Sequence, residues 1–366
     1  MAQKTIRKRA DRDPNSEGSH FVVACLGGAR TALEERPVPV PGAGEMLLRL
    51  RVVGFCGTDL FKLDTGGAAP GAVLGHELVG EVVALGDGVG RFHDGERIAV
   101  PHHVPCGECV YCRRGNETMC DVFRENLLEP GGFADTILVR PRATALAARA
   151  LPDHVGDEAA VFMEPAACVL RGVRRSGMGA GGNAVVLGAG SMGLLHLLVL
   201  KAVNPDAAVV VVDPDGERRG MAEKLGATAA IPPGAEAEDA VRAVTDGAGA
   251  DTVFDTVGGN ETLTTGLGLT RQGGTVVLFA HAPEDAEARF NLNEVFKHER
   301  RILGTYSAAL DEQAEIFDLV AGGVLDPSPL VTHRLPLDDF EDGVKLVRDH
   351  KALKVLFTPS RAGERR

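Results

Sequence analysis

The sequence has no hydrophobic run long enough to cross a membrane and no excess of positive charge. Its longest apolar runs are far shorter than the ~20 residues that a membrane-spanning helix needs. The 51 acidic residues outnumber the 39 Lys and Arg residues, so the net charge is −12 and the surface repels polyphosphate. Residues 1–20 also lack the apolar core of a secretory signal. We therefore expect a cytoplasmic protein that binds neither membrane nor nucleic acid.

Residues 1–20 are polar and carry a cluster of basic side chains, opposite in sign to the net charge of the chain. The cluster consists of Lys4, Arg7, Lys8, Arg9 and Arg12. A solvated, disordered leader is the favoured interpretation, and a targeting or partner-binding arm is the alternative.

The composition is neither that of a disordered chain nor that of a fibre. Hydrophobic residues make up 44% and charged residues 25% of the chain, close to the globular average. The 46 glycines lack the three-residue period of collagen, so they predict tight turns and close backbone contacts. Since 366 residues exceed the ~250–300 at which one hydrophobic core stops growing, we expect two domains.

The apolar pattern divides the chain into two parts, which together predict an α/β fold. From residue 21 to about 146, short apolar runs broken by Gly and Pro predict strands of a β-rich domain. Between about 161 and 306, apolar strands alternate with helical stretches, as in a parallel βαβ sheet. After residue 306 the pattern predicts helices near Asp311–Val320 and Asp338–Asp349 and a closing strand at Lys354–Phe357.

A glycine-rich turn follows the strand expected at Ala184–Leu187 and opens a helical stretch. Gly188 permits the tight turn, Gly190 lets the backbone approach a pyrophosphate, and Gly193 lets the helix pack closely on the strand. The start of the helix offers free N–H groups and the positive end of the helix dipole to phosphates. The sequence therefore predicts dinucleotide binding by Gly188, Gly190, Ser191, Met192 and Gly193.

Asp213 is the second signal for a dinucleotide, 20 residues after Gly193 and at the end of the strand expected at Val209–Val212. A carboxylate at this place can accept both hydroxyls of the adenosine ribose and repels a 2′-phosphate, so it favours NAD. Arg218 and Arg219 lie nearby and leave NADP open. The alternative interpretation is a flexible glycine turn followed by an incidental aspartate.

Four of the seven cysteines form the pattern C-x2-C-x2-C-x7-C. Cysteines so close together rarely make good mutual disulfides, and a chain without an export signal uses them more often for metal. This spacing lets four thiolates converge on one tetrahedral Zn²⁺ and leaves no open coordination position. We therefore predict a structural zinc held by Cys106, Cys109, Cys112 and Cys120.

Further residues of metal-binding type are dispersed, in Gly54-Phe-Cys-Gly-Thr-Asp59, Gly75-His-Glu77 and Met163-Glu-Pro165. The order of these motifs, the four-cysteine loop, and the run of glycines from Gly75 to Gly95 before Arg97 resemble the zinc-dependent medium-chain alcohol and polyol dehydrogenase family. The resemblance covers about residues 21–357, almost the whole chain.

The resemblance implies a two-domain architecture for this α/β chain. A GroES-like β-rich catalytic domain is expected at residues 21–165 and 307–366, and a Rossmann domain with a doubly wound parallel sheet at 166–306. The active site is expected in the cleft between the two domains. Such proteins pair through edge strands of the nucleotide domain, so a homo-oligomer, either a dimer or a tetramer, is expected.

The resemblance also implies a catalytic zinc. Cys56 and His76 match zinc ligands of the family. Glu164 stands where many alcohol dehydrogenases have a second cysteine, as in the sorbitol-dehydrogenase-like branch. Glu77 matches a carboxylate beside the metal, which either binds zinc directly or lies behind the ligands. With the cysteine loop, the expectation is two Zn²⁺ per chain.

Three more positions match family residues around this zinc. Thr58 matches a hydroxyl that relays the alcohol proton, or it is a turn hydroxyl bonded to backbone. Asp59 matches the carboxylate that orients the histidine ligand. Lys354 matches a basic residue that reaches a cofactor phosphate across the cleft, or it is a surface lysine. The chain departs from the family at Phe61, where many members have a histidine that passes the proton to solvent. The proton must therefore leave by Thr58, a ribose hydroxyl and water, or through another group such as Glu77.

The expected activity is hydride transfer between a secondary alcohol and NAD, because zinc lowers the pKa of a bound hydroxyl. His102 and His103 precede the cysteine loop, where a polar pocket would suit a polyol, cyclitol, sugar derivative or amino alcohol. A primary-alcohol dehydrogenase of the same fold is the nearest alternative. A non-catalytic NAD-binding sensor that kept the fold is the alternative of another class.

Overall fold

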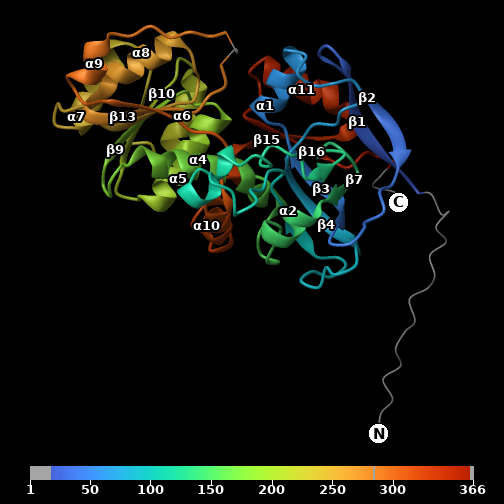
Figure 1. Cartoon of the computed structure of the whole chain (residues 1–366). Helices are drawn as coiled ribbons and strands as arrows, with labels where there is room; N and C mark the ends of the chain where they lie inside the picture. The colour runs from blue at the N-terminus through green and yellow to red at the C-terminus, as the bar shows by residue number, and fades with distance from the viewer. Residues whose placement is uncertain (1–17, 283–284, 363–366) are drawn as a thin grey trace.

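The computed structural model describes residues 18–282 and 285–362. Figure 1 shows two lobes side by side, a β-rich lobe built from both ends of the chain and a parallel-sheet lobe built from its middle. The basic cluster of the expected leader lies outside the described residues, and the first strand begins at Ser19. Within the described ranges, no helix is long and apolar enough to span a membrane.

The β-rich lobe is organised around an eight-stranded sheet. Its main path runs β15-β16-β3-β4-β5-β8, and β7 joins β3 while β6 pairs with β7. The strands are β3 (Met46–Gly54), β4 (Glu77–Leu85), β5 (Arg97–Ala99), β6 (Leu128–Glu129), β7 (Thr136–Val139), β8 (Arg149–Ala150), β15 (Val331–Pro336) and β16 (Lys354–Thr358). Because β16 pairs antiparallel with β3, a segment from the end of the described chain completes a sheet begun near its start.

Smaller elements cover this sheet. They are the hairpin β1 (Ser19–Gly27) and β2 (Arg30–Pro37), and the helices α1 (Gly57–Asp64), α2 (Pro141–Leu146), α3 (Asp157–Ala160) and α11 (Phe340–Arg348). The four-cysteine loop carries two short 3-10 turns, Cys112–Arg114 and Glu117–Met119, and two more lie at Ser328–Leu330 and Leu337–Asp339. Four phenylalanines, at 55, 133, 340 and 357, pack ring against ring in the core of this lobe.

The second lobe has a six-stranded, wholly parallel sheet in the order β11-β10-β9-β12-β13-β14. The strands are β9 (Asn183–Leu187), β10 (Ala208–Val212), β11 (Ala229–Ile231), β12 (Ala250–Asp255), β13 (Thr270–Leu278) and β14 (Arg301–Gly304). This is the doubly wound dinucleotide-binding order, and the strand order reverses at β9. The predicted fold class is confirmed.

Helices cover both faces of the parallel sheet. Alternate residues of its strands face opposite ways: Val209 and Val211 join one core cluster, and Val210 and Val212 join another. The helices are α4 (Met163–Ser176), α5 (Ser191–Val203), α6 (Gly216–Lys224), α7 (Ala235–Val244), α8 (Asn260–Leu269), α9 (Leu292–Phe296) and α10 (Leu310–Ala321).

Helix α10 packs against α4, and its buried residues Ile316 and Val320 belong to a core cluster that contains residues of both lobes. The apolar stripe of α10 finds its partner on α4, and the chain returns to the β-rich sheet only at β15. Arg171 of α4 strengthens this packing, because its guanidinium lies 3.3 Å from Glu312 of α10 and 3.5 Å from Glu117 of the cysteine loop.

Candidate active site and zinc centres

The metal-binding residues of the active site lie where β3, α1 and β4 meet. Cys56 is the N-cap of α1, two residues after β3 ends, and Glu77 is the first residue of β4. Gly54 pairs with Glu77 across the two strands. A Cβ at residue 54 would collide with the Glu77 carboxylate, so only glycine lets this side chain lie across the strand.

Asp59 holds the ring of His76 in one orientation. Its fully buried carboxylate lies 3.4 Å from His76 Nδ1 and accepts hydrogen bonds from the amides of Cys56 and Gly75 at 3.2 and 3.3 Å. Burial by itself raises the pKa of Asp59, but the His76 imidazole and the two amides outweigh it and lower that pKa. Because Nδ1 is engaged, His76 Nε2 is the nitrogen left for a metal.

Cys56, His76 and Glu77 converge. One ligand atom from each lies within 4.8 Å of the others. Glu77 Oε2 accepts a hydrogen bond from Lys354, whereas Glu77 Oε1 is buried without a hydrogen-bond partner among the described residues. A buried carboxylate oxygen left unpaired beside a thiol and an imidazole is suited to bind a metal ion, and sulfur, nitrogen and oxygen are the ligands of zinc. The residues present therefore fit a zinc ion.

Glu164 lies next to this group without joining it. It is in the first turn of α4, 3.6 Å from the sulfur of Cys168 and 3.9 Å from His102 Nδ1. Burial raises the pKa of Glu164 to about 7, and the charge of Glu77 acts in the same direction. The structure thus brings three of the four predicted ligands together and leaves Glu164 as a fourth, adjacent carboxylate.

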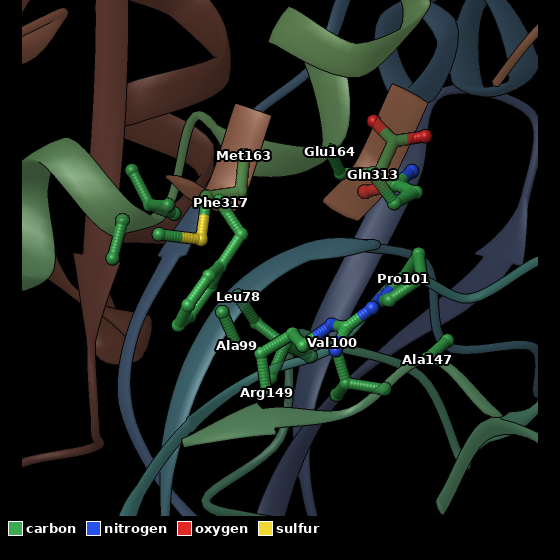
Figure 2. Close-up of a pocket in the computed structure, with 12 residues that line it drawn as sticks. Leu78, Ala99, Val100, Pro101, Ala147, Arg149, Met163, Glu164, Gln313 and Phe317 are labelled. Atoms are coloured by element: carbon green, nitrogen blue, oxygen red, sulfur yellow. The ribbon is translucent and has the colours of Figure 1, made fainter. Parts of the chain in front are cut away.

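A cavity borders Glu164 on the side of α10 (Figure 2). Its lining is largely apolar and includes Leu78 of β4, Ala99 of β5, Met163 of α4 and Phe317 of α10. This apolar border contributes to the burial that raises the pKa of Glu164. The cavity is close to the metal group through Leu78, which follows Glu77 on β4.

Lys354 corrects one prediction. The sequence predicted that it reaches a cofactor phosphate, but its side chain is 1% exposed and its Nζ donates to Glu77 Oε2 at 2.7 Å and to the Phe55 carbonyl at 3.4 Å. Burial alone lowers the pKa of Lys354, but the charges of Glu77 and Cys56 outweigh burial and raise it. Strand β16 carries the ammonium into the metal group, where it balances charge.

The four cysteines of the loop form a compact cluster of free thiols. The sulfur of Cys112 lies 3.5 Å from Cys109 and 4.0 Å from Cys106, and the sulfur of Cys120 lies 3.5 Å from Cys106. A tetrahedron with Zn–S bonds of ~2.3 Å has edges of about 3.8 Å, so these separations suit one zinc ion. Cys112, Cys120 and Phe123 are the buried side chains of a core too small to hold the loop alone.

The glycine turn lies at the carboxyl end of β9, where the strand order reverses. Gly188 has a φ of +96°, and a Cβ on Gly193 would collide with the Gly188 carbonyl. Gly190 caps α5, whose first turn contains Ser191 and Met192. Asp213 follows β10, and its Oδ2 accepts a hydrogen bond from the Ala189 amide at 2.6 Å. The acid is thus held against the turn, and each oxygen keeps a lone pair for a ribose hydroxyl.

Arg218 and Arg219 bind backbone carbonyls. Arg218 donates to the carbonyl of His350 in the β-rich lobe at 3.3 Å. Arg219 donates to the carbonyls of Asp213 and Pro214, both at 2.8 Å. Both guanidinium groups therefore already bind backbone.

His102 and His103 stack beside the metal group. The His102 ring centre lies 4.5 Å from that of His76 and 3.6 Å from that of His103. Burial lowers the pKa of His102 well below its usual value and that of His103 to about 3, and the charge of His76 acts in the same direction. Both rings are neutral near pH 7, and His102 Nδ1 is buried without a hydrogen-bond partner in the described chain.

A contact between the lobes escaped sequence reasoning. His281 follows β13, and its Nε2 lies 3.2 Å from the hydroxyl of Thr58 on α1. Its ring also stacks on Phe61, with 5.6 Å between ring centres. No motif surrounds His281. The one available signal was its position just past the carboxyl end of a parallel strand, where ligands bind in open α/β sheets.

Comparison with known proteins agrees with this geometry. Residues 42–150 match the alcohol dehydrogenase GroES-like domain, and residues 191–322 match the zinc-binding dehydrogenase model. L-galactonate-5-dehydrogenase of Escherichia coli (strain K12) is 32% identical over 86% of this chain and 91% of its own. L-threonine 3-dehydrogenase of Thermococcus kodakarensis is 33% identical over 89% of this chain and 94% of its own.

Among solved structures, the alcohol dehydrogenase of Thermus sp. ATN1 superposes with a TM-score of 0.81 at 29% identity and covers 93% of this chain and 99% of its own. The matches confirm the prediction of an oxidoreductase that uses zinc and a nicotinamide dinucleotide. The chain belongs to the zinc-dependent medium-chain alcohol and polyol dehydrogenase family.

Proposed function

We propose that this dehydrogenase oxidises the secondary alcohol of a polyol, a sugar acid or a hydroxy amino acid with NAD⁺. The proposal rests on one observation above all: Cys56, His76 and the unpaired Oε1 of Glu77 converge in a buried group. Bound there, zinc supplies a Lewis acid that acidifies an alcohol hydroxyl, and the nicotinamide accepts the hydride. The chain's own residues hold the metal, orient the alcohol and carry its proton away.

The catalytic site is proposed to combine three direct ligands with two supporting groups. Cys56, His76 and Glu77 hold the metal, and Asp59 fixes the ring of His76. Glu164, which the sequence predicts as a ligand, is the alternative carboxylate. The zinc content of Glu77→Gln and Glu164→Gln separates these assignments, because Gln keeps the size of Glu but loses its charge. The variant of the true ligand should lose the catalytic zinc, and the other variant should keep it.

NAD is the proposed cofactor. The Asp213 carboxylate lies against the glycine turn, where ribose hydroxyls can bind it and a 2′-phosphate meets like charge. Arg218 and Arg219 do not argue for NADP, because each binds backbone carbonyls.

The histidine pair and the relatives both favour a polar substrate. His102 and His103 present neutral ring nitrogens beside the metal group, and hydroxyl-rich molecules can satisfy such groups. L-galactonate and L-threonine, named in the two relatives, each carry secondary hydroxyls on a polar skeleton. A polar secondary alcohol is therefore favoured over a simple primary alcohol.

The test is NAD⁺ reduction across matched alcohols: sugar acids, sugar alcohols, cyclitols, 3-hydroxy amino acids, and a primary and a secondary alkanol of equal carbon number. We expect the polar secondary alcohols to give the highest kcat/KM. In a His103→Leu variant, the advantage of polar substrates over 2-butanol should shrink. Preference for the primary alkanol would favour the primary-alcohol alternative. NAD binding with two zinc ions and no turnover on any substrate would favour the sensor.

We also propose a cytoplasmic homo-oligomer that forms through the parallel-sheet lobe. Among the described strands, β14 has a sheet neighbour on one side only. Nearby, Leu292 and Phe296 of α9 are 74% and 79% exposed, an unusual display of large apolar side chains. Light scattering should report a dimer or tetramer, and Phe296→Glu should lower the mass toward that of the monomer. A monomeric parent protein would reject the proposal.

A further inference from the structure

His281 reaches from the parallel-sheet lobe to the hydroxyl that stands next to the metal group. Thr58 lies two residues after the ligand Cys56, on the first turn of α1. Its Oγ1 lies 3.2 Å from His281 Nε2, within hydrogen-bond distance, although 223 residues separate the two in sequence. The contact joins the two lobes directly at the candidate active site.

Two features hold the His281 ring in place. The backbone before it is fixed, because the amides of Phe279 and Ala280 both donate to the carbonyl of Asp255 at 3.1 and 3.2 Å. The ring lies nearly parallel to Phe61, at an interplanar angle of 17°. Phe61 is three residues after Thr58, so one face of α1 presents both the hydroxyl and the stacking ring to the same imidazole.

We propose that His281 is the relay residue that passes the alcohol proton from Thr58 to solvent. This inference rests on the proposed function. Phe61, on the same helix as Thr58, cannot serve as the relay, because a phenyl ring cannot accept a proton. In this chain, Phe61 orients the imidazole, and the imidazole itself comes from the other lobe. His281 acts through Thr58, so it is a positioning residue for proton transfer and does not touch the substrate.

The proton balance closes without a further reactant. As NAD⁺ takes the hydride from the alcohol carbon, the hydroxyl proton moves to Thr58 Oγ1 while the Thr58 proton moves to His281 Nε2. The imidazolium then releases its Nδ1 proton to water, and exchange with water resets the tautomer. His281 is exposed, so this last transfer needs no buried path. The net result is ketone, NADH and one proton in solvent.

The relay joins residues of two different lobes. Because Thr58 and His281 belong to different lobes, the relay is complete only when the lobes stand as close as they do here. Proton release therefore depends on the spacing of the two lobes.

The test compares His281→Leu, His281→Gln and the double variant His281→Leu/Phe61→His with the parent enzyme. Gln can still hydrogen-bond to Thr58 but cannot pass on a proton. The double variant places a histidine on α1 in place of Phe61. We expect both single variants to lower kcat by about 100-fold, the scale of general acid–base catalysis, with KM for NAD⁺ changed by less than about threefold. Added imidazole and the Phe61→His change should each restore part of kcat.

A readout without turnover checks the contact itself. In the zinc-loaded enzyme without cofactor, NMR of the ¹⁵N-labelled imidazole of His281 should show a shift when Thr58 becomes Val and none when it becomes Ser. This result stands even if no tested alcohol is a substrate, which separates failure of the relay from failure of the proposed function. A kcat in His281→Gln equal to that of the parent, or an imidazole signal indifferent to Thr58→Val, would overturn the proposal.

Discussion

The buried ion pair between Lys354 and Glu77 makes a strong prediction about stability. Their charged atoms lie 2.7 Å apart, and the side chains are 1% and 0% exposed. Lys354→Met keeps the length of the side chain but removes the charge, which leaves the Glu77 carboxylate buried with no cation. Removing one partner of such a pair costs about 3–5 kcal/mol of unfolding free energy. The ammonium also lies 5.4 Å from the centre of the Phe162 ring, and that smaller attraction is lost too.

A double-mutant cycle isolates the pair. Glu77→Gln alone leaves the Lys354 ammonium unpaired, so it should destabilise the protein on the same scale. The double variant buries no unpaired charge, so its loss should fall short of the sum of the single losses by about 3 kcal/mol. For a lobe of this size, a single variant should unfold about 6–20 °C below the parent.

Thermal unfolding followed by circular dichroism, with and without saturating zinc, measures these differences. Zinc should recover part of the loss in Lys354→Met, because the metal supplies positive charge to the orphaned carboxylate, and none of the loss in Glu77→Gln. Strictly additive single losses, or a Lys354→Met variant as stable as the parent, would refute this account of the ion pair.

Three further predictions concern other parts of the molecule. Cys112→Ser should lower zinc from two ions per chain to one by elemental analysis, and the cysteine loop should become sensitive to protease while the catalytic zinc stays; loss of both ions would show that the two sites are linked. Asp213→Ala should raise KM for NAD⁺ about tenfold and leave KM for NADP⁺ unchanged or lower, since the carboxylate favours ribose hydroxyls and repels phosphate; equal effects on both cofactors would place Asp213 outside the ribose site. His196 is buried, and burial lowers its pKa to about 4. Between pH 6.5 and 4 the unfolded chain therefore binds a proton at this residue that the folded chain does not. The free energy of unfolding should fall by about 2 kcal/mol through this group between pH 8 and pH 5. His196→Leu should therefore show a correspondingly weaker acid destabilisation in urea unfolding than the parent, and an identical pH dependence would contradict the shift.

Features written within a short stretch of chain were predictable from the sequence. The strand expected at Val209–Val212 and the helix expected at Asp311–Val320 were found at 208–212 and 310–321, because apolar periodicity reports which face of an element is buried. The glycine turn was recognisable because Gly188 and Gly193 have backbone roles that a residue with a side chain would not fill. The structural zinc site was likewise predictable, because its four cysteines lie within fifteen residues, from Cys106 to Cys120.

Pairings between distant segments were not predictable from local patterns. Lys354 and Glu77 are 277 residues apart, and nothing near either one indicates the other. Thr58 and His281 meet only because the lobes close on each other. Helix α10 showed its apolar stripe in the sequence, but the stripe alone did not indicate that α4 would cover it. Resemblance supplied the roles of dispersed residues, and at Lys354 it supplied the wrong one.

The arrival of Lys354 on β16 also bears on how the protein matures in the cell. Lys354 is the 277th residue that the ribosome adds after Glu77. Until then, the Glu77 carboxylate has no lysine partner. The ion pair therefore forms only after β16 has been synthesised and has paired with β3, which makes it one of the last contacts that the growing chain can complete.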